Sequence, residues 1–178
     1  MSYIGAMSEG TPVSTTRIGP FCCFATGLGL VAYDADVAAD FIEGPGFEHP
    51  QGNNHVALEA ALADARAVML TTGQPQADYL IQVFLEPAPG EAPDGLVLAA
   101  GFPLTITSGT LCLRDAYELM DWETHAVQVV QVPLAPGRYY VELLRIDGPN
   151  GLCVLHLHLQ VAGPDDELPP PAGWVDLF

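Results

Sequence analysis

Apolar and polar residues alternate in short runs along most of this chain, and glycine or proline separates many of the runs. In one run Tyr139, Val141 and Leu143 occupy alternate positions, with Glu142 between the last two. A period of two is typical of a strand with one buried face. With 18 glycines and 16 prolines to form turns, the pattern predicts an all-β chain. We expect strands over residues 21–33, 67–72, 78–86, 95–101, 103–114, 126–134, 138–146 and 152–161.

One stretch, 53–68, departs from this alternation and favours a helix. It is rich in helix-forming residues, and an asparagine near its start can cap the first turn. Four apolar residues recur there at helical spacing, which predicts a short amphipathic helix: Leu58, Ala61, Leu62 and Ala65. Further on, the residues DGPNG at 147–151 predict a hairpin loop of four or five residues between two strands.

A phrase near residue 34 recurs near residue 115. DADVAADF (34–41) and DAYELMDW (115–122) each begin with Asp-Ala and carry a second aspartate six positions later, followed by an aromatic residue. Each phrase follows an apolar strand and precedes another apolar strand and then a tyrosine-led strand. This order predicts an internal duplication with half-repeats 21–90 and 103–161. The matching residues are Asp34, Asp40, Phe41 and Tyr79 in one half and Asp115, Asp121, Trp122 and Tyr139 in the other.

We expect these matches to be structural. Asp34 and Asp115 end strands, where their carboxylates would cap the turn that follows. Phe41 and Trp122 would pack at equivalent ends of the apolar core, one in each half-repeat. The predicted fold is mainly β: an antiparallel β-sandwich with one short helix, formed as a single domain over residues 1–178.

The charge of the chain is strongly one-sided. It has 22 acidic residues, five arginines and no lysine, which gives a net charge of −17. Such a charge repels nucleic acid and attracts a basic protein. A simpler interpretation is that the acidic residues keep an apolar-rich protein in solution. No run of about 20 apolar residues predicts a membrane span, and the N-terminus lacks the pattern of a secretory signal, so a cytoplasmic protein is expected.

The last segment, 163–178, combines acidic residues, four prolines (three of them consecutive) and large apolar side chains, and it predicts an extended arm. Acidic and aromatic residues in an arm suit docking onto a basic partner. The candidate binding residues are Asp165, Asp166, Glu167, Trp174 and Phe178. The alternative is that the arm folds back and that Trp174 and Phe178 cover one edge of the sandwich.

Two histidines form the best candidate for a metal site. His156 and His158 point to the same face of the predicted strand, about 7 Å apart. A metal would need a third ligand, such as His125, His55 or an acidic residue. Two exposed histidines on the polar face of a sheet explain the same pattern without a metal. No cofactor is expected.

The four cysteines fit no metal spacing and are expected to be buried free thiols in a reducing compartment. Pairing of Cys112 with Cys153 is the alternative. No nucleophile elbow or phosphate-binding glycine loop is present, so the residues indicate no catalytic chemistry.

The segment VQVVQVPLAPGRYYVELLRI (127–146) resembles a hairpin found in bacterial all-β proteins. In that pattern an apolar strand meets a Pro-Gly turn and continues as an aromatic-led strand. The competence protein J group, inhibitors of a DNA-entry nuclease, carries a similar hairpin. The resemblance spans about 20 residues; it implies a β-sandwich and an inhibitor or immunity role, and it assigns no functional residue.

The sequence therefore favours a non-enzymatic cytoplasmic binding protein whose acidic surface engages a basic protein partner, as an inhibitor or immunity-type factor would. One alternative is a small metal-dependent enzyme that uses His156 and His158. A second alternative is a sandwich that binds a sugar or other small molecule in a pocket lined by Trp122, Tyr117 or Tyr140.

Overall fold

The computed structural model describes residues 17–25, 29–38, 54–71, 77–116 and 129–177. The elements within these ranges are β1 (Arg17–Ala25), β2 (Leu30–Asp34), α2 (Asn54–Ala63), β3 (Ala67–Thr71), β4 (Ala77–Phe84), β5 (Leu96–Ile106), β6 (Thr110–Asp115), β7 (Val130–Pro133), β8 (Gly137–Asp147), a 3-10 turn (Pro149–Gly151), β9 (Cys153–Ala162) and β10 (Trp174–Asp176).

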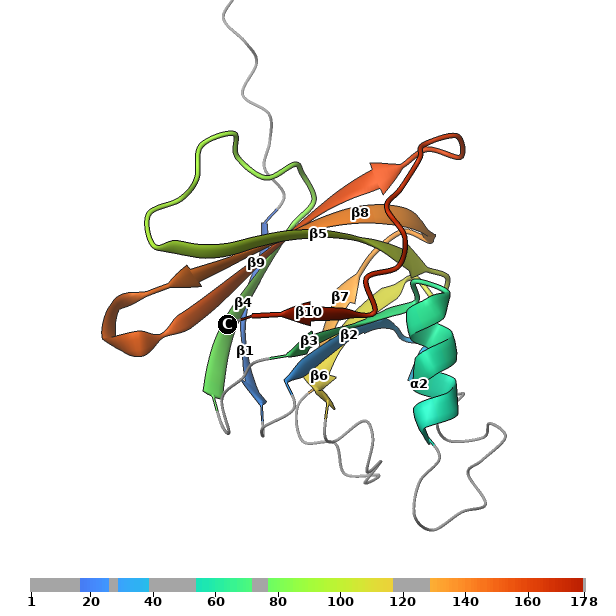
Figure 1. Ribbon diagram of the computed structural model, residues 1–178, viewed down its shortest axis with the longest axis horizontal. Coiled ribbons are helices and arrows are strands. Elements are labelled where there is room, and N and C mark those ends of the chain that lie inside the picture. Colours follow the sequence, from blue (N-terminus) through green and yellow to red (C-terminus); the bar gives the residue numbers. More distant parts are fainter. Residues whose placement is uncertain (1–16, 26–28, 39–53, 72–76, 117–128, 178) are drawn as a thin grey trace, which may run out of the picture.

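The strands form two five-stranded sheets, which confirms the predicted β-sandwich (Figure 1). Sheet A has the strand order β1-β4-β9-β8-β5, and sheet B has the order β10-β3-β2-β6-β7. Most neighbouring strands are antiparallel, but β4 pairs with β9 and β10 pairs with β3 in parallel. The sheets are therefore mixed and mainly antiparallel.

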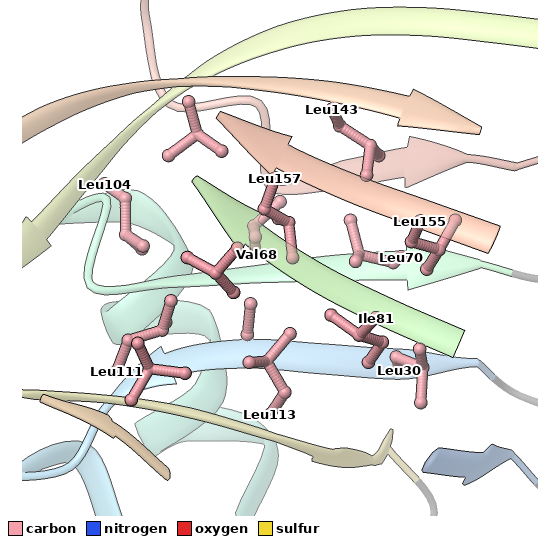
Figure 2. Packing of buried hydrophobic residues seen from close by; sticks show 14 of the residues in the cluster. Leu30, Val68, Leu70, Ile81, Leu104, Leu111, Leu113, Leu143, Leu155 and Leu157 are labelled. Carbon is pink, nitrogen blue, oxygen red and sulfur yellow. The ribbon is translucent and has the colours of Figure 1, made fainter. Parts of the chain in front are cut away.

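Side chains from the two sheets meet in one apolar core (Figure 2). Leucines at every second position of a strand point inward, as the alternation predicted. Burial of each leucine side chain stabilises the fold by roughly 2 kcal/mol. In β4 and β8 the matched tyrosines, Tyr79 and Tyr139, are both buried in this core. The residues labelled in Figure 2 are Leu30, Val68, Leu70, Ile81, Leu104, Leu111, Leu113, Leu143, Leu155 and Leu157.

The outer face of sheet B is covered by α2, which buries the predicted helical stripe. The helix ends at Ala63, because Ala65 adopts a left-handed conformation with φ 53°. The Arg66 N–H then donates to the Ala61 carbonyl at 2.8 Å, which closes the helix in the manner of a Schellman motif. Strand β3 begins directly afterwards at Ala67, so the helix is shorter than the helix-favouring stretch 53–68.

Two predicted strand boundaries are wrong. The expected strand 21–33 is two strands, β1 and β2, which lie in different sheets. Strand β5 continues through Pro103 to Ile106, and the turn falls at 107–109. Proline is tolerated in β5 because this strand lies at the edge of sheet A. The predicted hairpin at 147–151 is confirmed by the antiparallel pairing of β8 with β9.

The first four strands, β1 to β4, and the next four, β5 to β8, occupy equivalent places in the two sheets. Sheet A places the β1–β4 and β8–β5 pairs on either side of β9, and sheet B sets β3–β2 beside β6–β7. At the centre of sheet B, the Ala35 N–H donates to Thr110 O at 3.0 Å and the Ala116 N–H donates to Gly29 O at 2.9 Å. A duplicated four-strand unit would produce this arrangement, and the duplication stays a prediction. Asp40, Phe41, Asp121 and Trp122 lie outside the described residues.

Candidate functional site

Asp34, the first residue of the repeated phrase, is a fully buried structural residue. Its carboxylate accepts hydrogen bonds from the Thr107 hydroxyl at 2.5 Å, from the Ser108 N–H at 3.0 Å and from the Ser108 hydroxyl at 2.5 Å. The Arg66 guanidinium donates to it at 3.0 Å. Burial alone would raise the pKa of Asp34, but the hydrogen bonds from Ser108, Thr107 and Arg66 outweigh burial and lower it to about 2.

The expectation that Asp34 caps the turn after its own strand is wrong. Its side chain instead holds the 107–109 turn, which joins β5 to β6. Asp115 is also buried, with 3% of its surface exposed. Both aspartates therefore lie inside the sandwich and are not presented to a ligand at the surface.

A polar group also lies beneath α2 on the outer face of sheet B. Tyr33 and Cys112 are neighbours across β2 and β6, and both are buried. Burial, followed by the nearby Cys112, raises the pKa of Tyr33 to about 12. Burial likewise raises the pKa of Cys112 to about 11, so this thiol is protonated and unreactive at neutral pH.

All four cysteines are free, so the alternative disulfide between Cys112 and Cys153 is not formed. The expectation of four buried thiols is wrong for Cys22, which is exposed on β1 next to the buried Cys23. Cys153 is half-buried.

His156 and His158 lie on the outer face of sheet A, as expected, but His158 is only 3% exposed. Its ring stacks on Phe84 with 4.5 Å between the centroids and 7° between the planes. The expectation of two exposed histidines is therefore wrong: His156 is half-buried, and His158 is buried with Phe84 stacked on its ring. Burial lowers the pKa of both histidines.

Within the described ranges, neither ring nitrogen of His158 has a hydrogen-bond partner in good geometry. Among the described residues no three metal-binding side chains lie together. His125 lies outside those residues, and His55 belongs to α2, which packs on sheet B. The metal site stays a prediction that rests on the two histidines alone.

The positive charge of the chain is largely engaged in internal contacts. Arg66 pairs with Asp34, and Arg114 is buried at 1% exposure. Arg145 donates to the Leu177 carbonyl and, at 3.0 Å, to the Asp147 carboxylate. Of the arginines, only Arg17 and Arg138 are exposed, so the charge presented to solvent is predominantly negative.

Arg138 holds the turn that carries three of the predicted binding residues. Its guanidinium donates to the carbonyls of Gly163, Pro164 and Asp166 at 3.3–3.5 Å. The Asp166 carboxylate accepts the Gly163 N–H at 2.7 Å. Asp165, Asp166 and Glu167 are exposed in this turn, which we name the acidic turn (163–167).

The arm beyond the acidic turn folds back onto sheet B. Its prolines lie outside regular structure as expected, and the arm then ends in β10, which pairs with β3. Val175 and Leu177 are the residues it buries. Trp174 was expected either to anchor a partner or to cover an edge; it is 56% exposed, and Phe178 lies outside the described residues.

A hollow of about 420 Å³ opens where β4 and β9 end, against the turn between β7 and β8. Sequence reasoning missed it, because three separate segments form its wall. Val161, at its mouth, is 74% exposed, and Leu85, also in its wall, is 39% exposed. The wall is mostly apolar and includes Leu85, Pro87, Pro133, Leu134, Leu159 and Val161.

Tyr140, expected in a small-molecule pocket, lines a second, smaller hollow of about 220 Å³ together with Gly101 and Glu142. The other two aromatic residues proposed for such a pocket, Tyr117 and Trp122, lie outside the described residues. This hollow is on the outer face of sheet A, where β8 meets β5.

The two mixed sheets, with β9 set between β4 and β8, place the chain among β-sandwich proteins. No protein-family model matches the chain, and no curated protein matches it in sequence. Solved structures with this fold include crocagin biosynthetic gene J, which is 13% identical with a TM-score of 0.56, over 82% of this chain and 98% of that one. They also include ComJ from Bacillus subtilis, the inhibitor of the DNA-degrading activity of NucA, which is 8% identical with a TM-score of 0.52, over 84% of this chain and all of ComJ, 100%.

At these identities the comparisons establish a shared fold. The hairpin expected within 127–146 is wrong, because β7 lies in sheet B and β8 lies in sheet A. The likeness to ComJ is therefore one of fold, and it covers 84% of this chain. Within the described residues, no helix is long and apolar enough to span a bilayer.

Proposed function

We propose that the protein is a non-enzymatic binding protein whose acidic surface engages a basic protein partner, as an inhibitor or immunity-type factor. The observation that carries this proposal is the distribution of charge. Arg66 and Arg114 are engaged in the interior, and Arg138 is bonded to backbone carbonyls. Little positive charge is left to neutralise the exposed acidic residues.

The acidic turn is the part of this surface that fits a partner best. Its three carboxylates are adjacent in sequence and exposed, and the Arg138 contacts and the Gly163–Asp166 hydrogen bond fix the turn that carries them. A fixed cluster loses little entropy on binding, so more of its electrostatic attraction contributes to affinity.

The fold is consistent with inhibition of a nuclease. ComJ, which shares the fold, is described as the inhibitor of a DNA-degrading activity. Enzymes that bind DNA present basic surfaces to its phosphates. A protein of net charge −17 can compete for such a surface, and we propose an enzyme of this kind as the partner.

Capture from the native lysate tests this function. The tagged full-length protein is incubated with the lysate of its source organism at low salt and again at high salt. We expect a stoichiometric basic protein at low salt that is lost as salt rises. The recovered protein is then assayed on plasmid DNA, where the inhibitor role predicts cleavage that this protein stops at equimolar ratio. Recovery of no basic protein at either salt would count against the proposal.

A further inference from the structure

We propose that the hollow bordered by Val161 receives a large apolar side chain of the basic partner, and that cationic residues flanking that side chain lie over the acidic turn. This inference rests on the proposed function and adds the chemistry of the segment that is recognised: an aromatic or long aliphatic residue between lysines or arginines.

The size and lining of the hollow favour an apolar group. An apolar cavity of about 150 Å³ can hold a benzene molecule, and this hollow has about 420 Å³. Its wall is formed mainly by leucine, proline and valine side chains. The Tyr139 hydroxyl in the wall donates to the Ala135 carbonyl at 2.6 Å, so it does not require a polar ligand.

The walls are held in place before any ligand binds. The Glu142 carboxylate accepts the Ala88 N–H at 3.3 Å and the Gln160 side-chain amide at 3.2 Å. Ala88 follows the wall residue Pro87, and Gln160 lies in the wall on β9, so one carboxylate links the segment after β4 to β9. A site formed in advance does not pay an ordering penalty when it is filled.

Charge around the hollow selects a basic neighbour for the apolar side chain. Glu86 is the charged residue in its wall. Asp165 follows Val161 by four residues, so their Cα atoms lie within about 14 Å of each other. The nearby cation, Arg138, donates to backbone carbonyls of the acidic turn. An incoming segment thus meets an apolar hollow beside carboxylates.

A protein side chain fits this hollow better than a free small molecule does. Small-molecule sites usually enclose about 70–90% of the ligand surface. Here Val161 at the mouth is 74% exposed, which makes the hollow shallow on that side. A shallow apolar hollow with a charged rim is typical of the centre of a protein interface.

Three small probes test the recognised chemistry by NMR titration of the ¹⁵N-labelled full-length protein. They are acetyl-Lys-Phe-Lys-amide, acetyl-Lys-Ser-Lys-amide and indole. We expect the phenylalanine peptide to shift the amides of Leu134, Leu159 and Val161, and to bind at least tenfold more tightly than either other probe. Equal binding of the serine peptide would overturn the apolar role. Equal binding of indole would overturn the role of the flanking cations and indicate a small-molecule site.

Two variants with the same added charge locate the effect. Val161→Arg places a cation at the mouth of the hollow, whereas Val56→Arg places one on α2, where Val56 is 58% exposed. We expect Val161→Arg to weaken the phenylalanine peptide at least tenfold and Val56→Arg to change its affinity less than twofold. Val161→Ser, which adds no charge, should weaken it about threefold. Equal affinity of the two arginine variants would overturn the proposed site.

The same pair of variants separates this inference from the proposed function. If the unmodified protein captures a basic partner and Val161→Arg captures it as well as Val56→Arg does, the hollow is not the site although the function holds. If the unmodified protein captures no basic partner, the proposed function fails, and the peptide titration still decides what the hollow recognises.

Discussion

Arg138 and Asp166 are neighbours, but they do not form an ion pair. The guanidinium donates to the Asp166 backbone carbonyl at 3.4 Å, while the Asp166 carboxylate accepts the Gly163 N–H at 2.7 Å. The basic residue nearest to the acidic turn therefore shapes the backbone instead of neutralising the side chains. Within the described chain, Asp165, Asp166 and Glu167 form no salt bridge, which leaves their charge available to a partner.

Replacing the buried aspartate should destabilise the fold strongly. Asp34→Asn keeps the shape of the side chain but removes the charge opposite Arg66 and turns an amide toward the Thr107 hydroxyl. We expect a loss of about 3 kcal/mol in the free energy of unfolding at pH 7, measured by urea denaturation. Asp78→Asn removes an exposed charge and should change that free energy by less than about 0.5 kcal/mol. Equal effects of the two variants would contradict the structural role of Asp34.

The contribution of Asp34 should depend on pH with a defined sign. Its pKa is about 2 in the folded protein and 3.8 in the unfolded chain, so the unfolded chain binds the proton first as pH falls. The carboxylate stabilises the fold above pH 4, and about 2 kcal/mol of this is lost as pH falls from about 4 to 2. The difference in stability between the native protein and Asp34→Asn should narrow over that window. If the difference in unfolding free energy stayed constant over that window, the negative charge of Asp34 would not be the source of its stabilising effect.

The features that could be predicted from the sequence are those formed by residues close together in the chain. Alternation alone predicted β4, β8 and β9, and helical spacing predicted the buried Leu58 and Leu62. The acidic turn was found because its residues are adjacent in the chain. The burial of His158 was missed because its cover comes from Phe84 and the segment that follows, which lie far earlier in the chain.

The hollow could not be predicted for the same reason. Val161, Leu85 and Leu134 come from three distant segments, and only the strand order of both sheets brings them together. The internal match between the halves predicted Asp34 correctly as a strand end. It gave the wrong turn, because the partner of that carboxylate, Ser108, lies in the other half of the chain.

Replacing the buried histidine by phenylalanine should reduce the sensitivity of the fold to acid. Burial lowers the pKa of His158 below its ordinary value of 6.5, so the unfolded chain takes up the proton first as pH falls below 6.5 and stability is lost. His158→Phe keeps the stacking on Phe84 and removes the buried titratable ring. At pH 8 we expect its stability to lie within about 1 kcal/mol of the native protein.

At pH 5 the same variant should be more stable than the native protein, as measured by thermal unfolding at the two pH values. His156→Phe serves as the comparison, because His156 is less buried and should give a smaller gain. If the native protein were as stable as His158→Phe at pH 5, or more stable, the description of His158 as a buried neutral group would be contradicted.

One glycine should be irreplaceable. Gly29 has φ +125°, and a Cβ there would lie 2.1 Å from the Leu70 carbonyl oxygen, which belongs to the paired strand β3. Gly29→Ala should therefore lower the free energy of unfolding by at least about 3 kcal/mol. Gly90, in the loop before β5, is open to solvent, and a methyl group added to it would meet no other atom within 4 Å among the described residues. Gly90→Ala should be neutral or stabilise by about 0.5 kcal/mol. A tolerated Gly29→Ala would contradict the close approach of Gly29 to the Leu70 carbonyl of β3.

Thiol labelling should distinguish Cys22 from the other three cysteines. Cys22 is exposed, Cys23 and Cys112 are buried, and Cys153 is half-buried. With Ellman's reagent at pH 8 we expect one thiol to react rapidly in the native protein and all four to react in urea. Loss of the rapid phase in Cys22→Ser is the control. Rapid reaction of two or more thiols in that variant would contradict the burial described for β1, β6 and β9.

We propose that the acidic turn, more than the overall charge, binds the partner. The direct test is the dissociation constant of the purified partner for two triple variants that change the net charge equally. Asp165→Asn/Asp166→Asn/Glu167→Gln neutralises the turn, and Glu59→Gln/Asp78→Asn/Asp94→Asn neutralises three exposed residues elsewhere. We predict at least tenfold weaker binding for the turn variant, about 1.4 kcal/mol, and less than threefold for the other. Equal losses would show that binding depends only on overall charge, and no loss in either variant would contradict the acidic binding surface.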